Sequence, residues 1–388
     1  MRVSKKTIFT FTLVTLLYWF ALYSYSSYIT PMADSLGASA VMSGLIASAY
    51  GFAMMIFRIP IGILSDRLNK RKLFVQLGSL LICLSGLGLS LAKTPFVMLM
   101  SRTLAGIGVS TWVSITVLYN SYFPPEESQK ALSDINLLSK VGSFAAGFAG
   151  AAVAAWLATM RGAFYVSFIA GLVGFVLSFF IHENKAVDKE PLTFRELLPV
   201  FKSKSVLFAG ISCGLFQLML YATGMSFASN LAYNVGANDF QVGILNTIMS
   251  AGGMISGFLL PRFFIKIIDE KALLIISNLV AGVCCVLFPF TSNVYTIFAI
   301  EFASGFVSSF GLALYMALAV RNIPEAKKSS AMGVYQAIYA LGVFAGPAIS
   351  GMFIQQFGYT VAFLLIGMFA LVNILVQLLC YTKAMQPQ

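Results

Sequence analysis

Long apolar blocks separated by short polar connectors are the dominant pattern of this chain. A helix crosses the hydrocarbon core of a membrane with about 20 apolar residues. Twelve blocks reach that length, namely residues 8–30, 39–63, 73–92, 95–120, 131–157, 163–181, 206–230, 240–264, 271–290, 294–320, 330–355 and 360–381. The pattern therefore predicts an all-α integral membrane protein with twelve transmembrane helices.

The only long polar segment, residues 182–205, divides the predicted helices into two sets of six. The two sets resemble each other, because Gly142 has a counterpart in Gly342 and Arg102 has one in Glu301. A duplicated six-helix unit explains this internal repeat. We expect a pseudo-symmetric molecule with an N-terminal six-helix bundle at residues 1–181, a cytoplasmic linker at 182–205 and a C-terminal six-helix bundle at 206–388.

Lysine and arginine collect in alternate connectors, which fixes the expected orientation. If the N-terminus is cytoplasmic, only Lys93 and Arg161 fall in outer connectors. Cytoplasmic connections of membrane proteins carry such an excess of cations. We therefore expect a multi-pass protein of the cell (plasma) membrane with both termini in the cytoplasm. Topology then explains the net charge of +11, so we expect lipid headgroups as the anionic partner and no nucleic acid.

The polar residues offer no catalytic cluster. All five cysteines lie within predicted spans, where thiols pack as small apolar groups, and the single histidine, His182, lies in the linker. The sequence contains no G-x-x-x-x-G-K-[ST] phosphate-binding loop. We expect no enzyme activity, no cofactor, no metal and a monomer. A polytopic receptor or membrane enzyme is kept only as a third alternative.

A short cluster of charged and turn-forming residues lies between the second and third blocks. It reads Gly62-x-Leu64-Ser65-Asp66-Arg67-x-Asn69-Lys70-Arg71. This segment resembles the loop signature of the major facilitator superfamily, G-x-L-a-D-r-x-G-r-[KR], at the connection where that family has it. Arg102-x-x-x-Gly106-x-Gly108 is similar to the family's second motif, R-x-x-x-G-x-G. The resemblance covers essentially the whole chain and implies a secondary transporter, similar to bacterial drug or metabolite efflux proteins, that works by alternating access.

Two departures from the family pattern bear on its function. Asn69 replaces a glycine, and asparagine tolerates the left-handed conformation, so we expect the turn to persist. The antiporter motif of helix 5, G-x-x-x-G-P-x-x-G-G, is met only in part, with Phe148 in place of the proline. The resemblance assigns gating roles to Gly62, Asp66, Arg67, Arg71, Gly106, Gly142, Gly346 and Pro347. The cations of the loop also fit the simpler interpretation that they only set the orientation.

Ionisable residues within membrane spans are costly and so indicate function. Three stand out, Arg102, Lys140 and Glu301. One interpretation pairs Arg102 with Glu301 across the two halves as a structural ion pair. The other makes Glu301 the proton-coupling carboxyl group and places Lys140 in contact with substrate. Both interpretations remain open at this point.

Polar and aromatic residues recur at helical spacing within several blocks. Asn136 precedes Lys140 by one turn, and Gln217 precedes Tyr221. In the resembled family, helices 1, 4, 7 and 10 line the central cavity. The candidate substrate cavity is therefore Tyr25, Arg102, Asn136, Lys140, Gln217, Tyr221 and Glu301, although packing between helices would place some of these residues there as well.

We therefore predict a secondary active transporter of a small molecule. The favoured hypothesis is proton-coupled efflux (antiport) of small amphipathic or aromatic compounds. The alternative is uptake or exchange of a small organic anion, which the cations Arg102 and Lys140 would help to neutralise.

Overall fold

The computed structural model describes residues 4–124, 127–183, 202–321, 323 and 328–385, and every regular element in them is a helix. The first half contains α1 (Lys5–Tyr23), η1 (Ser26–Tyr28), α2 (Ile29–Ser35), α3 (Ala40–Leu68), α4 (Arg71–Leu91), α5 (Pro95–Ser110), α6 (Trp112–Asn120), α7 (Ser128–Trp156) and α8 (Arg161–Ser178). The second half contains α10 (Lys204–Ala222), η3 (Thr223–Phe227), α11 (Ala228–Asn234), α12 (Asp239–Gly243), α13 (Leu245–Leu259), η4 (Leu260–Phe264), α14 (Ile265–Ile267), α15 (Glu270–Leu287), η5 (Phe288–Phe290), α16 (Val294–Val320) and α17 (Lys328–Met385). The predicted all-α fold is confirmed. Most of the predicted linker, residues 184–201, lies outside the described residues.

Eleven helical segments of the described chain are long and apolar enough to cross a membrane. The longest, α17, contains a non-helical residue, Gly358, with φ 75° and ψ 172°. A positive φ suits glycine, which lacks a Cβ atom, and here it turns the chain back into a second segment. The single helix α17 therefore accounts for two of the twelve predicted crossings.

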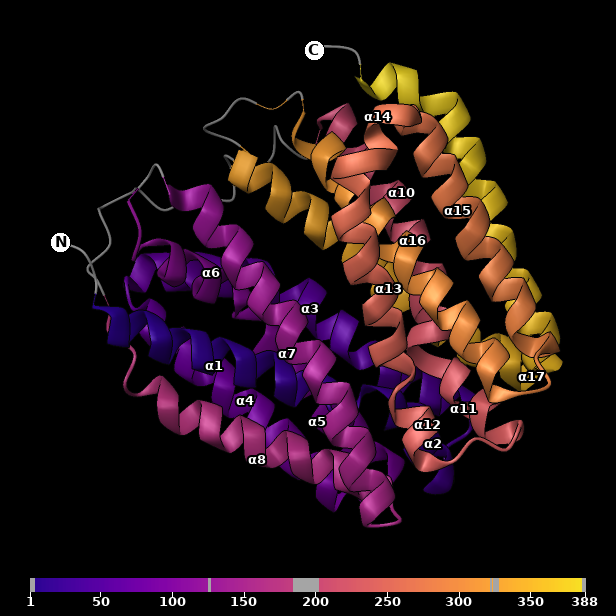
Figure 1. Ribbon diagram of the computed structural model, residues 1–388, viewed down its shortest axis with the longest axis horizontal. Coiled ribbons are helices and arrows are strands. Elements are labelled where there is room, and N and C mark those ends of the chain that lie inside the picture. Colours follow the sequence, from indigo (N-terminus) through magenta and orange to yellow (C-terminus); the bar gives the residue numbers. More distant parts are fainter. Residues whose placement is uncertain (1–3, 125–126, 184–201, 322, 324–327, 386–388) are drawn as a thin grey trace.

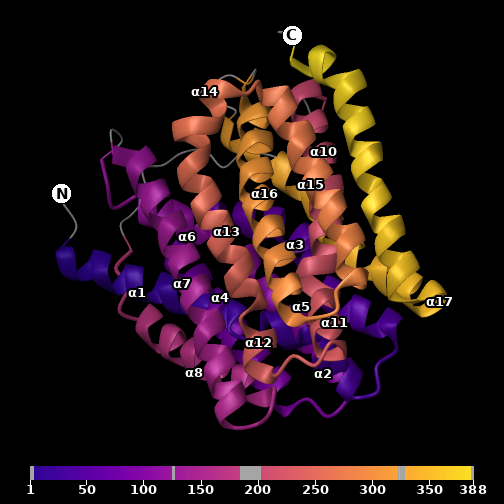
Figure 2. The same ribbon diagram turned by 45° about the vertical axis from the view of Figure 1, so that its right-hand side comes forward.

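The helices form two groups, α1–α8 and α10–α17, which approach each other at the end of the molecule farthest from the two termini (Figures 1 and 2). Each group has its own core of buried apolar side chains. A third core contains residues of both groups, among them Tyr28 and Met32 from the first and Phe227 and Leu231 from the second. We call this shared region the closed end and the opposite region the terminus-bearing end.

Close contacts between the groups lie toward the closed end. Gly44 of α3 packs against the backbone of Pro347 in α17, and Gly147 of α7 packs against Thr247 of α13. Toward the terminus-bearing end the space around helix glycines is open, because a Cβ atom built on Gly257 or Gly333 would meet no described heavy atom within 4 Å. The closest packing between the backbones of the two groups therefore lies toward the closed end, and contacts such as that between Phe52 and Phe344 continue it along α3 and α17.

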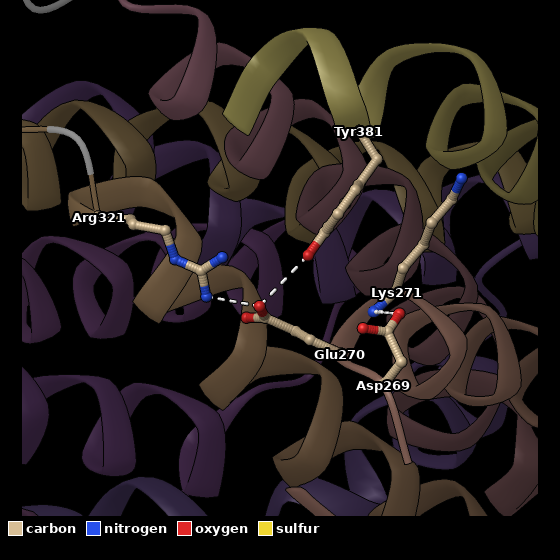
Figure 3. A network of polar contacts seen from close by, with 5 residues as sticks. All are labelled: Asp269, Glu270, Lys271, Arg321 and Tyr381. Carbon is tan, nitrogen blue, oxygen red and sulfur yellow. Dashed lines mark hydrogen bonds and ion pairs between the residues drawn. The ribbon is translucent and has the colours of Figure 1, made fainter. Parts of the chain in front are cut away.

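Each group is fastened at its terminus-bearing end by polar contacts between helix ends. In the second group, Arg321 Nη2 lies 2.5 Å from Glu270 Oε2, and the Tyr381 hydroxyl donates to the same oxygen over 3.2 Å (Figure 3). In the first group, Lys72 donates its backbone N–H to Glu183 Oε1 and its ammonium to the carbonyl of Phe179. Both halves therefore tie the first turn of a helix, α4 or α15, to neighbouring chain segments.

The turn between α3 and α4 adopts the predicted conformation. Asn69 has a φ of 48°, in the left-handed region that asparagine tolerates better than most residues. The replacement of the family's glycine therefore preserves the turn, as predicted.

Candidate functional site

A pocket lies between the two groups, near the closed end. Its lining combines Tyr23, Thr30, Tyr50 and Arg102 of the first group with Tyr221, Met225 and Ser226 of the second. Of the residues predicted from the sequence, Arg102 and Tyr221 line this pocket directly. Because both groups contribute to the wall, any movement of one group against the other changes the shape of the pocket.

Arg102 is held in place by aromatic side chains. Its Nη1 atom donates a hydrogen bond of 3.1 Å to the hydroxyl of Tyr25, which is itself 1% exposed. The guanidinium carbon lies 4.6 Å from the ring centroid of Tyr50 and 5.6 Å from that of Tyr25, within the range of cation–π attraction. Tyr25, predicted as a cavity residue, does not line the pocket itself and instead contacts Arg102.

The Arg102 guanidinium retains unused hydrogen-bonding capacity. Its Nε atom is buried without a hydrogen-bond partner. Among the described residues, no carboxylate lies within ion-pair distance of it. An arginine in this situation attracts a polar or anionic group that enters the pocket.

Glu301 lies in α16 and is fully buried, with neither carboxyl oxygen hydrogen-bonded. It faces Gly224 of η3, where a Cβ atom would come within 3.1 Å of Oε2 and 3.2 Å of Oε1. The ion pair between Arg102 and Glu301, one of the two sequence interpretations, is not formed in this conformation. The reason is that the repeat places them at equivalent positions of two separate groups, each with its own neighbours.

Lys140 and Asn136 lie on α7, nearer its start than Gly147. Lys140 is exposed, and it precedes Gly147 by two helical turns, so it projects from the side of α7 that meets α13 nearer the closed end. Asn136 is also exposed and donates a hydrogen bond of 2.8 Å to Leu132 of its own helix. The structure therefore does not bring these two residues into the pocket with Arg102.

Gln217 lies one turn before Tyr221 in α10 and is 8% exposed. Its Oε1 atom has no hydrogen-bond partner. Gln217 is a buried acceptor one turn from Tyr221 but does not line the pocket, so its place in a substrate cavity stays a prediction.

The residues assigned to gating are spread over several helix contacts. Gly106 packs against the backbone of Tyr50, Gly142 against Leu16 and Gly346 against Leu218, while the Pro347 carbonyl faces Gly44. Gly62 has only ordinary contact with Val113, and Arg67 is exposed. Arg71 begins α4, and the side chain of Asp66 lies outside the described residues. The gating roles themselves stay predictions.

The sequence did not single out two features of the pocket. Tyr23 and Tyr50 were missed because an aromatic residue in a membrane span also fits simple packing. The π-helical turn η3, which places Gly224 against Glu301 and Met225 and Ser226 in the pocket, was missed as well. In the sequence, only the polar and glycine residues of Thr-Gly-Met-Ser inside an apolar span mark this turn. Turns of this kind occur frequently at functional sites.

Hydrogen bonds between the two groups close the pocket on the side of the closed end. We call this boundary between α1–α8 and α10–α17 the seam. The Thr30 hydroxyl donates to the carbonyl of Ser226 over 2.7 Å, and the Tyr28 hydroxyl donates to the carbonyl of Asp239 over 2.6 Å. Asn246 Nδ2 donates to the hydroxyl of Ser27 over 3.0 Å. These bonds must break before the pocket can open toward the closed end.

The architecture and the seam pocket are those of a membrane transporter built from two helical bundles. The sequence profile of the Major Facilitator Superfamily matches residues 11–231 and 211–388, and the chain belongs to that family. It is therefore a multi-pass membrane transporter, as predicted.

The relatives agree with this assignment. The chain is 24% identical over 346 residues to an uncharacterized MFS-type transporter of Methanocaldococcus jannaschii, covering 84% of this chain and 85% of that protein. It is 23% identical over 333 residues to the quinolone resistance protein NorA of Staphylococcus aureus, covering 81% of each.

Solved structures share the fold. The nucleoside transporter NupG superposes with a TM-score of 0.79 at 15% identity, covering 97% of this chain and 99% of that one. A peptide transporter POT in complex with sulfate superposes with a TM-score of 0.80 at 15% identity, covering 99% of this chain and 96% of that one. At these identities the likeness concerns the fold alone.

Proposed function

We propose that this transporter exports small amphipathic or aromatic compounds in exchange for protons. It would act as a monomer in the cell membrane, with both termini in the cytoplasm. The observation that carries the proposal is the tyrosine-walled pocket around Arg102 at the seam, together with a fully buried, unpaired carboxyl group at Glu301. The quinolone resistance protein among the relatives supports the direction of transport.

The proposal assigns a conformation to the structure. Most cations outside the membrane spans belong to connectors at the terminus-bearing end, which the positive-inside rule places in the cytoplasm. The pocket would then be closed toward the outside by the hydrogen bonds of Thr30, Tyr28 and Asn246. Export requires these bonds to break and the opposite end to close, after which the pocket faces outward.

Glu301 is the candidate for proton coupling. A buried carboxyl group with no counter-ion and no hydrogen-bond donor is stable only in its neutral form. Protonation from outside, while the pocket faces outward, would give the neutral buried form, and water that enters from the terminus-bearing end would allow release of the proton to the cytoplasm. One proton would thus move inward in each cycle while the substrate moves outward.

A second candidate, uptake or exchange of a small organic anion, rests on a different observation. The Arg102 guanidinium has a buried Nε atom without a partner and no ion pair with a described carboxylate. Lys140 adds an exposed cation on the side of α7 nearest the other group. An anionic substrate would neutralise this region better than a cationic one.

Transport by the purified protein in liposomes distinguishes these candidates. With an imposed pH gradient, we expect a fluorescent aromatic cation to be driven by the gradient and benzoate not to be. Glu301→Gln should abolish gradient-driven accumulation but retain exchange across equal pH, whereas Glu127→Gln, at an exposed position, should match the wild type. Gradient-driven accumulation by Glu301→Gln at the wild-type rate would refute the coupling role, and benzoate transport lost in Arg102→Gln would establish the anion transporter.

A further inference from the structure

A second cavity lies at the closed end, with a volume of about 360 Å³. Its wall includes Pro31, Asp34 and Met160 of the first group and Asn230, Tyr233 and Tyr359 of the second. Among the described residues, none lines both this cavity and the pocket around Arg102. The transport function proposed above makes no use of it.

The wall of this closed-end cavity contains the carboxylate residue Asp34 and the amide residue Asn230, which are bonded to each other. Asp34 is exposed; its Oδ1 atom accepts a 2.5 Å hydrogen bond from the Ser43 hydroxyl, and its Oδ2 atom accepts one from Asn230 Nδ2. That bond fixes the orientation of the Asn230 amide, because its NH₂ group must face the carboxylate. Asn230 Oδ1 is consequently left as an acceptor that is buried without a partner, in a residue only 7% exposed.

An orphan acceptor of this kind carries a free-energy cost unless a ligand or solvent molecule donates to it. Each carboxylate oxygen of Asp34 can also accept a further hydrogen bond. A ligand that complements this site would therefore donate several N–H hydrogen bonds and carry a positive charge opposite the carboxylate.

Two tyrosines of the wall, Tyr233 and Tyr359, contact neighbouring side chains, and Pro31, Met160 and Asn234 complete the lining. The Tyr233 hydroxyl donates to Asp239 Oδ1 over 2.7 Å, and the Tyr359 ring lies 6.4 Å from that of Phe227. Arg161 follows the wall residue Met160, but its guanidinium is engaged by the carbonyls of Ser90 and Ala92. Ring faces beside a carboxylate attract organic cations through cation–π interactions.

We propose that the closed-end cavity binds a small organic ammonium ion. The ammonium group donates to the carboxylate of Asp34 and to Asn230 Oδ1, and its apolar part packs against Tyr233 and Tyr359. Because both groups of helices contribute to the wall, a bound cation holds the closed end shut and slows transport from the outer side. That last consequence rests on the proposed function, whereas the binding itself does not.

Binding is tested on the purified full chain with phenethylammonium and its uncharged analogue phenethyl alcohol. We expect phenethylammonium to raise the melting temperature and the alcohol to leave it unchanged at equal concentration. Asp34→Asn should raise the dissociation constant for phenethylammonium at least tenfold. The matched control Asp269→Asn removes an exposed carboxylate at the other end and should leave the constant unchanged.

A second variant protects the test against misfolding of Asp34→Asn. Asn230→Leu removes the orphan acceptor and should also weaken the binding of phenethylammonium. Arg102→Gln, in the central pocket, should leave that binding unchanged. Equal stabilisation by the alcohol, undiminished binding in both Asp34→Asn and Asn230→Leu, or loss of binding in Arg102→Gln would each overturn the proposal.

Transport measurements separate this proposal from the function above. Phenethylammonium added outside proteoliposomes should slow export by the wild type and not by Asp34→Asn. Binding that depends on Asp34 in a protein that moves no tested compound would uphold the site and refute the proposed function. Transport without Asp34-dependent binding would do the reverse.

Discussion

At the scale of single residues, the rare polar side chains inside the membrane spans carry most of the information. Arg102 and Glu301 could be singled out from the sequence because charge in an apolar span is costly and therefore uncommon. Their surroundings could not be predicted, since Tyr50 and Gly224 come from other helices and show no charge of their own. The repeat related the two charges by symmetry, but symmetry places them apart rather than in contact.

In the second group, a buried polar network is centred on the hydroxyl of Tyr315. Tyr315 is fully buried and accepts hydrogen bonds from Asn278 Nδ2 over 2.8 Å and from Gln377 Nε2 over 2.7 Å. Tyr315→Phe would leave both amides without this acceptor, so we expect a loss of about 1 kcal/mol of stability. Thermal unfolding in detergent measures it. Tyr295→Phe, at a side chain 71% exposed, is the control, and equal melting temperatures for the two variants would contradict the expectation.

At the scale of the helices, hydropathy predicted where the chain crosses the membrane but not where the helices break. The span at residues 95–120 is divided at Thr111 between α5 and α6, and the span at 206–230 contains η3. A run of apolar residues has the same mean hydropathy whether its hydrogen bonds follow the α or the π pattern. Breaks of this kind are set by contacts with other helices, such as that between Gly224 and Glu301.

Arg161 shows how one helix end explains a departure from the charge rule. It is one of two cations in connectors predicted to be outside, and its guanidinium donates to the carbonyls of Ser90 over 2.6 Å and Ala92 over 2.7 Å at the end of α4. A cation there also favours the helix dipole. We expect Arg161→Ala to lose about 2 kcal/mol in thermal unfolding and Lys93→Ala, an exposed outer cation, to lose almost none. A stable Arg161→Ala protein would show that the cap is dispensable.

At the scale of the whole molecule, the closure of one end is the feature that defines the conformation. The sequence predicted two related bundles and could not say which end would be closed, because one chain must support more than one arrangement of the same helices. The shared core and the hydrogen bonds of Ser27, Tyr28 and Thr30 supply that answer here.

A reversible lock at the closed end tests whether it must open during transport. Ser27 and Asn246 are hydrogen-bonded across the seam, so cysteines at both positions should form a disulfide on oxidation. We expect the oxidised double variant to lose transport and to regain it on reduction, with each single variant active throughout. Transport by the fully cross-linked protein would show that the closed end stays shut in the working cycle.

The chemistry of the seam has a consequence for how the protein responds to its surroundings. Among the described residues, the hydrogen bonds named here across the closed end join hydroxyl and amide donors to backbone carbonyls, a hydroxyl and the carboxylate of Asp34. Dissolved salt weakens attraction between opposite charges far more than it weakens hydrogen bonds from neutral donors. The stability of the closed end should therefore depend little on the ionic strength of the surrounding solution.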